Sequence, residues 1–159
     1  LVTHDRDEAF TMSDRVAIMV DGALEQIGQP ESVYHEPLNR RVAELTGMCD
    51  FIKGIVQPNY SVKTELGSLQ YNRNLKTFKV GTNVDLVIRP EDFTVDTSGP
   101  GQMMVAAREF RGDETMLSLS LPSGALIKSK QPSFSHIRIG ERLDVIPTHS
   151  RPFPTFETT

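Results

Sequence analysis

The sequence predicts a mainly β fold, in which a small β-barrel follows a short α/β segment. Two observations lead to this prediction. Helix caps and helix-terminating prolines occur only in the first 47 residues. From Phe51 onward, the pattern changes to short alternating or β-branched runs, each bounded by Gly, Pro, Asn or Asp, which is typical of a small barrel. We therefore expect two units, residues 1–47 and residues 48–159.

The chain begins with signals for the end of a strand and for a short helix. Residues 1–3 are apolar or β-branched, as at the end of a buried strand. Asp5 is placed to cap a helix, and Glu8 stands where a capping-box acid belongs. We expect this helix to end near Ser13.

A β-hairpin and two helices are expected next. The Asp21–Gly22 dipeptide, between β runs at 15–20 and 23–28, is a strong short-range hairpin signal. Proline suits the first position of a helix at 30–36, and a second helix is expected at 40–46.

Both helices have terminal signals. Pro37 ends the first, because it lacks a backbone donor and clashes with the preceding turn. Asn39 can cap the second helix, and Gly47 can end it in a left-handed conformation.

The β region contains ten candidate strands. They lie at 51–57, 61–66, 68–72, 78–80, 83–89, 93–96, 103–110, 114–121, 125–130 and 142–147. The last ten residues contain two prolines and no periodicity, so we expect an irregular and frayed tail.

Composition excludes several classes of function. The net charge of −4, without a basic stripe, argues against nucleic-acid binding. Cys49 is the only cysteine, and no Cys/His cluster has metal-ligand spacing, so no metal site is expected. No run of apolar residues is long enough to span a membrane. The chain starts with Leu1 instead of Met, so we expect it to be a piece of a longer protein.

Few residues stand out as candidates for chemistry. His4 directly follows a strand end, which is where open α/β sheets bind ligands. The other histidines, His35, His136 and His149, are scattered without metal-ligand spacing, so structural roles are expected for them.

The sequence resembles one known family in motif order over nearly its whole length. LVTHDRDEAFTMSDRVAIMVDGALEQIG, at residues 1–28, resembles the end of the nucleotide-binding domain of ATP-binding-cassette (ABC) transporters. QPESVYHEPLNRRVAELTG resembles the two-helix exit of importer ATPases with a C-terminal extension. LVIRPEDFTV and FRGDETMLSLSLPSG resemble the regulatory TOBE-type domain, an OB-like barrel.

This resemblance implies both fold and chemistry. Residues 1–47 would be the α/β C-terminal remnant of the ATPase domain, and residues 48–159 the TOBE-type OB-like barrel. His4 would be the switch histidine that contacts the γ-phosphate of ATP and helps to position the attacking water. ATP and Mg²⁺ would be cofactors of the full-length protein. The present chain lacks the Gly-x-x-x-x-Gly-Lys-Ser/Thr loop, so we expect it to be inactive alone and to need no cofactor.

The resemblance also implies partners. Arg89, Pro90 and Glu91 form a hallmark segment for which we expect a role in domain packing or subunit contact. The expected partners are a second ATPase subunit, the membrane permease, and a small-molecule or protein regulator. The expected location is the cytoplasm, at the inner face of the membrane through the permease.

A different class of function stays open, namely a small-oxyanion-binding module, because related OB-like barrels take oxyanions such as molybdate. Fold alone does not choose between the two. The sequence contains no recognisable anion-binding cluster, although backbone amides could supply one. The transported solute cannot be read from the sequence.

Overall fold

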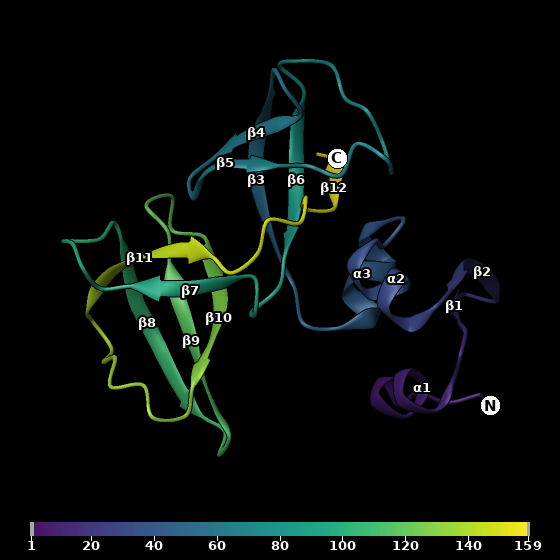
Figure 1. Cartoon of the computed structure of the whole chain (residues 1–159), viewed down its shortest axis with the longest axis horizontal. Helices are drawn as coiled ribbons and strands as arrows, with labels where there is room; N and C mark the ends of the chain where they lie inside the picture. Colours follow the sequence, from purple (N-terminus) through teal and green to yellow (C-terminus); the bar gives the residue numbers. More distant parts are fainter. Residues whose placement is uncertain (1, 159) are drawn as a thin grey trace.

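The structure is a computed structural model that describes residues 2–158 (Figure 1). It is mainly β: two five-stranded antiparallel sheets follow a small segment of helices and a hairpin. This arrangement confirms the predicted fold class, a β-rich domain with OB-like sheets preceded by a short α/β segment.

The first segment contains five elements. They are α1 (Arg6–Met12), β1 (Val16–Val20), β2 (Ala23–Gly28), α2 (Pro30–His35) and α3 (Arg40–Thr46). The predicted caps are present, because the Asp5 side chain accepts from the backbone N–H of Asp7 and Glu8, and the Asn39 side chain accepts from that of Val42. Asp21 and Gly22 have φ angles of 50° and 79°, as the predicted two-residue hairpin turn requires.

A small apolar core holds this segment together. Val16 of β1, Val33 of α2 and Val42 of α3 are buried against one another, and partly buried Phe10 and Ile18 pack around them. The apolar face of β1 therefore has a cover, although Met19 and Leu24 of the hairpin stay exposed.

The β region consists of two sheets. One contains β3 (Asp50–Gln57), β4 (Ser61–Thr64), β5 (Gly67–Gln70), β6 (Asn83–Ile88) and β12 (Thr155–Glu157), in the order β12-β6-β3-β4-β5. The other contains β7 (Phe93–Asp96), β8 (Met103–Phe110), β9 (Glu114–Ser120), β10 (Leu126–Pro132) and β11 (Arg142–Pro147), in the order β10-β9-β8-β11-β7. One apolar cluster joins them, since Val56, Leu86, Phe93, Leu117 and Leu143 all belong to it.

The chain crosses between the two sheets twice. After α3 it enters the first sheet, and it crosses to the second at residues 89–92, between β6 and β7. Residues 148–154, between β11 and β12, return it to the first sheet, as the yellow connection in Figure 1 shows. A side chain also connects the two sheets, because Asp50 of β3 accepts from the backbone N–H of Lys128 in β10 at 2.6 Å.

The prediction of an irregular and frayed tail is wrong. Phe153 is 4% exposed and stacks on Phe93 with ring centroids 5.7 Å apart. Thr155–Glu157 pairs with β6 as strand β12. The segment contains two prolines and no periodicity, and its backbone partner is a strand some 70 residues away, which local periodicity cannot reveal.

The prediction of a strand at 78–80 is also wrong. Phe78 is buried, but its backbone N–H donates to the Tyr71 hydroxyl at 3.3 Å and not to a strand. The residue is apolar because it fills the core, and its neighbours Lys79 and Val80 are exposed in a loop.

We expect Phe153→Ala to lower the free energy of unfolding by about 3 kcal/mol, because a large buried aromatic side chain is lost from the core. Phe134, 77% exposed, is the matched control, and its replacement by Ala should cost less than about 0.5 kcal/mol. Urea unfolding measures both. Equal, small losses would mean that the C-terminal segment is not part of the core.

Asp50 generates a prediction about pH. Burial raises the pKa of its carboxyl, and the hydrogen bond and charge of Lys128 oppose this effect. Since the folded-state pKa lies above the unfolded one, the folded state binds the proton more tightly, and stability falls as pH rises through that interval. Asp50→Asn keeps an acceptor for the Lys128 N–H and should raise Tm at pH 7. It should also remove the part of the decrease in stability with rising pH that comes from ionisation of Asp50. A Tm difference between variant and wild type that does not change from pH 3 to pH 7 would contradict it.

Candidate functional site

The crossing at residues 89–92 is a tight turn with the sequence Arg-Pro-Glu-Asp. The Arg89 backbone N–H donates to Asp92 Oδ2 at 2.7 Å, and the Asp92 N–H donates to the Arg89 carbonyl at 3.0 Å. The turn is held from outside as well, because the Lys130 N–H donates to the Pro90 carbonyl and the Thr148 N–H to the Asp92 carbonyl. The backbone here is therefore fixed by β10 and by the segment that follows β11, both belonging to the second sheet.

The side chain of Arg89 leaves this turn and enters the first segment. Although it is only 4% exposed, its guanidinium donates to the Tyr34 carbonyl at 2.9 Å and to Thr46 Oγ1 at 3.0 Å. A longer hydrogen bond of 3.4 Å reaches the Met48 carbonyl. The guanidinium carbon lies 3.7 Å from the centroid of the Tyr34 ring, a cation–π contact.

Helix geometry explains why the Tyr34 carbonyl is available as an acceptor. The last carbonyls of a helix have no partner within the helix, and their partial negative charge attracts a cation. Tyr34 lies in the last turn of α2, and Thr46 is the last residue of α3. Arg89 thus binds the ends of both helices with one side chain.

Tyr34 and Glu91 complete this contact. The Tyr34 hydroxyl donates a short hydrogen bond to Glu91 Oε1. Burial, followed by this hydrogen bond, raises the pKa of Tyr34 far above its usual value, so the hydroxyl stays protonated and remains a donor. We call Tyr34, Thr46, Arg89, Glu91 and Asp92 the Arg89 junction.

Gly47 permits this close packing, but not in the predicted way. Its φ of 163° is extended backbone, so the left-handed cap predicted from the sequence is wrong. A Cβ at this position would lie 2.9 Å from a ring carbon of Tyr34 and about 3 Å from the guanidinium nitrogens of Arg89 and Arg6. Glycine is needed here for space and not for its backbone conformation.

A second contact lies at the other end of α3. Arg40 donates to Asp85 Oδ2 at 2.8 Å, and the Asp85 side chain is 8% exposed. The Arg40 guanidinium also lies over the ring of Phe51. Thr158 donates to the other oxygen of Asp85 at 3.1 Å, so the carboxylate is satisfied from two directions.

The sequence does not reveal that Asp92 and His149 pair with each other. His149 Nε2 lies 2.8 Å from Asp92 Oδ1, and His149 Nδ1 accepts from the Arg151 backbone N–H. Nε2 is therefore the protonated nitrogen of the neutral ring. Asp92 has a local sequence signal, since an Asp that accepts from a nearby backbone N–H is common in turns. His149 has none, because its partner is 57 residues away in the sequence.

His4 lies elsewhere. It is exposed, just before α1, and it lines a surface hollow together with Phe10, Val16 and Leu45. The structure therefore does not bring His4 together with Arg89, Pro90 and Glu91. Arg89 and Pro90 are buried and Glu91 is exposed.

Residues 2–158 contain no group of three or more His, Cys, Asp or Glu side chains arranged to hold a metal ion. They also contain no helix that is long and apolar enough to cross a membrane.

Comparison with protein families defines the class of protein. The family model of the TOBE domain matches residues 86–149, a range that runs from β6 through the Arg89 turn to His149. The chain therefore carries a TOBE domain.

Individual relatives narrow this class. The chain is 35% identical over 146 residues to the spermidine/putrescine import ATP-binding protein PotA of Aster yellows witches'-broom phytoplasma, covering 91% of this chain and 34% of the relative. It is 31% identical to PotA of Clostridium acetobutylicum, covering 92% and 41%, and 32% identical to the Fe(3+) ions import ATP-binding protein FbpC of Fusobacterium nucleatum, covering 91% and 35%. The chain thus spans 34% to 41% of the length of these relatives. It matches the C-terminal, TOBE-containing region of ABC-importer ATP-binding subunits.

We expect Gly47→Ala to lower the free energy of unfolding by about 1–3 kcal/mol, because the new Cβ displaces Tyr34 and Arg89 from each other. Gly99→Ala is the control, since a Cβ there meets nothing within 4 Å, and it should change stability by less than about 1 kcal/mol. Denaturant unfolding compares the two. Similar effects of both substitutions would show that the junction tolerates a wider separation between Tyr34 and Arg89, and would contradict the prediction.

Proposed function

We propose that the complete protein is the ATP-hydrolysing subunit of an ABC importer, and that this chain is its C-terminal coupling and dimerisation region. In this proposal, residues 1–47 end the nucleotide-binding domain and residues 48–159 form the regulatory domain. The relatives named for spermidine/putrescine and for Fe(3+) ions match the chain with similar identity, so the chain itself does not select a solute.

The observation that carries the proposal is the Arg89 junction. A buried guanidinium that binds the ends of α2 and α3 ties the first segment to the turn between β6 and β7. Any rotation of α2 and α3 must then move β6 and its sheet, because breaking the contact would strand a buried charge. A rigid connection of this kind is what coupling between an ATPase domain and a regulatory domain requires.

ATP and Mg²⁺ belong to the complete protein in this proposal. His4, the switch histidine by resemblance, would contact the γ-phosphate and help to position water. The residues of this chain do not make an ATP site by themselves, since His4 is a single exposed side chain and the sequence has no phosphate-binding loop. No hydrolytic step is therefore assigned to the 159-residue chain.

The proposed partners follow from the same reading. Two copies of the complete subunit would pair, with their TOBE domains in contact, and both would engage a membrane permease. This assembly would lie at the cytoplasmic face of the membrane. A regulator that binds the paired and unpaired states differently by a few kcal/mol would be enough to shift their balance.

Light-scattering mass over a concentration series tests the dimerisation role on this chain. We expect a mass that rises from that of one chain to that of two as concentration increases. A mass that stays at one chain throughout would contradict the dimerisation role. A monomer whose melting temperature rises with molybdate, sulfate or tungstate would favour the alternative, a small-oxyanion-binding module.

The role of His4 is tested in the complete subunit. We expect His4→Ala to lower the rate of ATP hydrolysis by about 10²-fold, because a positioned group beside the reacting phosphate contributes about that much. ATP binding should change little. His136→Ala, at an exposed loop position, is the control and should leave the rate unchanged. Full activity of the His4 variant would contradict the proposal that His4 is the switch histidine.

A further inference from the structure

Helix α1 lies between His4 and the Arg89 junction. The helix begins at Arg6, two residues after His4, and Asp5 caps it. It has seven residues, and none of them is buried. A helix of this length has little stability of its own, so its position depends on the few side chains that contact its neighbours. The position of His4 depends on the same side chains, because only Asp5 separates it from the helix.

Phe10 is one of these side chains. Its ring packs edge-on against the ring of Tyr34, with the centroids 6.2 Å apart and the planes at 90°, which is a favourable geometry for an aromatic pair. The same Tyr34 ring receives the Arg89 guanidinium, and the Tyr34 hydroxyl donates to Glu91. One aromatic ring therefore contacts both α1 and the turn after β6.

Arg6 is the second of these side chains. A Cβ at Gly47 would lie 3.1 Å from a guanidinium nitrogen of Arg6 and 3.0 Å from one of Arg89, so the two side chains meet at this glycine. The Asp7 carboxylate accepts from the Arg6 guanidinium at 2.7 and 2.9 Å and offsets its charge there. Arg6 and Phe10 are four residues apart, so they lie on the same face of α1. That face is the one that α1 turns toward the junction.

The surroundings of His4 share residues with the junction. His4, Phe10 and Thr46 line the same surface hollow. The hydroxyl of Thr46 accepts from the Arg89 guanidinium at 3.0 Å. A displacement of Arg89 therefore acts on this hollow through two contacts, one at Thr46 and one through the rings of Tyr34 and Phe10.

We propose that Arg6 and Phe10 are positioning residues for ATP hydrolysis, which hold α1 against the Arg89 junction and so let the regulatory domain control the place of His4 at the γ-phosphate. This inference rests on the proposed function, because it takes His4 as the switch histidine. In it, neither Arg6 nor Phe10 touches the nucleotide, and both act through α1. A movement of the turn after β6 then changes the rate of phosphoryl transfer, since this reaction depends mainly on positioning.

Amide exchange, measured by NMR on the 159-residue chain, tests the attachment of α1. The Ala9 N–H donates to the Asp5 carbonyl at 3.1 Å and reports on the first turn of the helix. We expect Tyr34→Leu to increase the exchange rate of this amide about fivefold, because Phe10 loses its ring partner. The Val84 amide of β6 is the internal control and should keep its protection. An unchanged rate at Ala9 would contradict the proposal.

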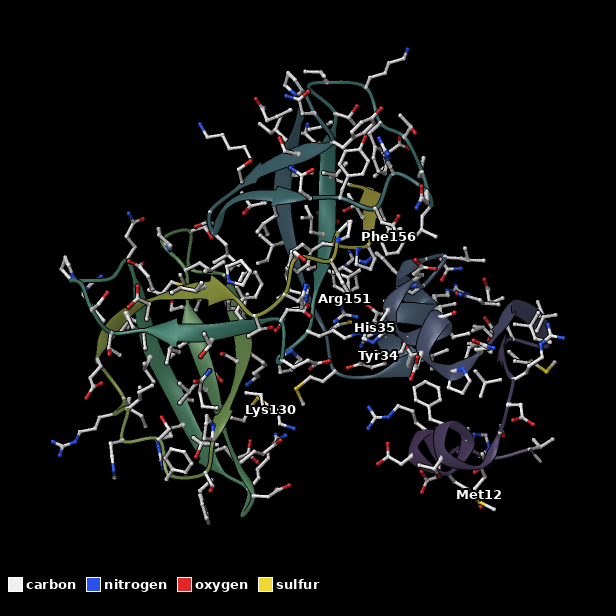
Figure 2. All side chains as sticks on the ribbon, viewed as in Figure 1. Met12, Tyr34, His35, Lys130, Arg151 and Phe156 are labelled. Atoms are coloured by element: carbon white, nitrogen blue, oxygen red, sulfur yellow. The ribbon has the colours of Figure 1, made fainter. Side chains whose placement is uncertain are left out.

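Kinetics of the complete subunit test the consequence for hydrolysis. We expect Phe10→Leu to lower kcat about tenfold and to leave KM for ATP unchanged, because His4 is misplaced while the nucleotide still binds. Met12→Leu is the matched control and should keep the full rate. Met12 lies on the same helix, is 73% exposed and points away from α2 (Figure 2).

A double-mutant cycle shows whether the two rings act through one contact. The variant with both Phe10→Leu and Tyr34→Leu should have the same kcat as Tyr34→Leu alone. Additive losses would contradict the proposal, because they would mean that the two side chains act independently. A raised KM with unchanged kcat in Phe10→Leu would also contradict it, because that result indicates a role in nucleotide binding.

His4→Ala separates this inference from the proposed function. If His4→Ala slows hydrolysis and Phe10→Leu does not, the inference fails and the switch-histidine assignment stands. If neither variant slows hydrolysis, both the assignment and the inference are contradicted. Loss of rate in both variants, with KM for ATP unchanged in Phe10→Leu, is the result that the proposal predicts.

Discussion

The guanidinium of Arg89 is the contact on which the arrangement of this molecule depends. It arises from a turn whose backbone is hydrogen-bonded to the second sheet, and it ends on the Tyr34 carbonyl of α2 and the Thr46 hydroxyl of α3. Helices of six and seven residues have little stability of their own, so their positions must come from tertiary contacts. Arg89 supplies such a contact, and Gly47 leaves the space in which it forms.

The contact between Arg40 and Asp85 adds a second attachment, so that the orientation of α3 is fixed as well as its position. Helix α3 is held at its first residue by Asp85 and at its last residue by Arg89. Along α3, Arg40 and Thr46 are separated by about 9 Å, at the helical rise per residue. Along the extended chain, their partners Asp85 and Arg89 are separated by about 13 Å. Because the two spans are comparable, α3 is held at both ends by β6 and the turn after it, and it cannot swing about either contact alone.

The sequence predicted the local features well, since each has a local cause. The Asp5 and Asn39 caps, the Asp21–Gly22 turn and most strands follow from residues adjacent in the chain. The features it missed arise from distant partners. Phe153 is buried because Phe93 and strand β6 receive its segment, and His149 acquires a role only beside Asp92. At the candidate site, the sequence singled out Arg89 and Glu91, while Tyr34 and Thr46 needed the structure to join them.

The central claim is that Arg89 specifically fastens the helices to the β region. Native-state hydrogen exchange on Arg89→Met tests this claim most directly, because it reports opening one element at a time. The account predicts that the Val33 amide of α2 and the Ala43 amide of α3 exchange much faster than in the wild type, whereas the Val84 and Leu86 amides of β6 keep their protection. Unchanged protection of α2 and α3 would contradict the account, as would an equal loss in the helices and in β6.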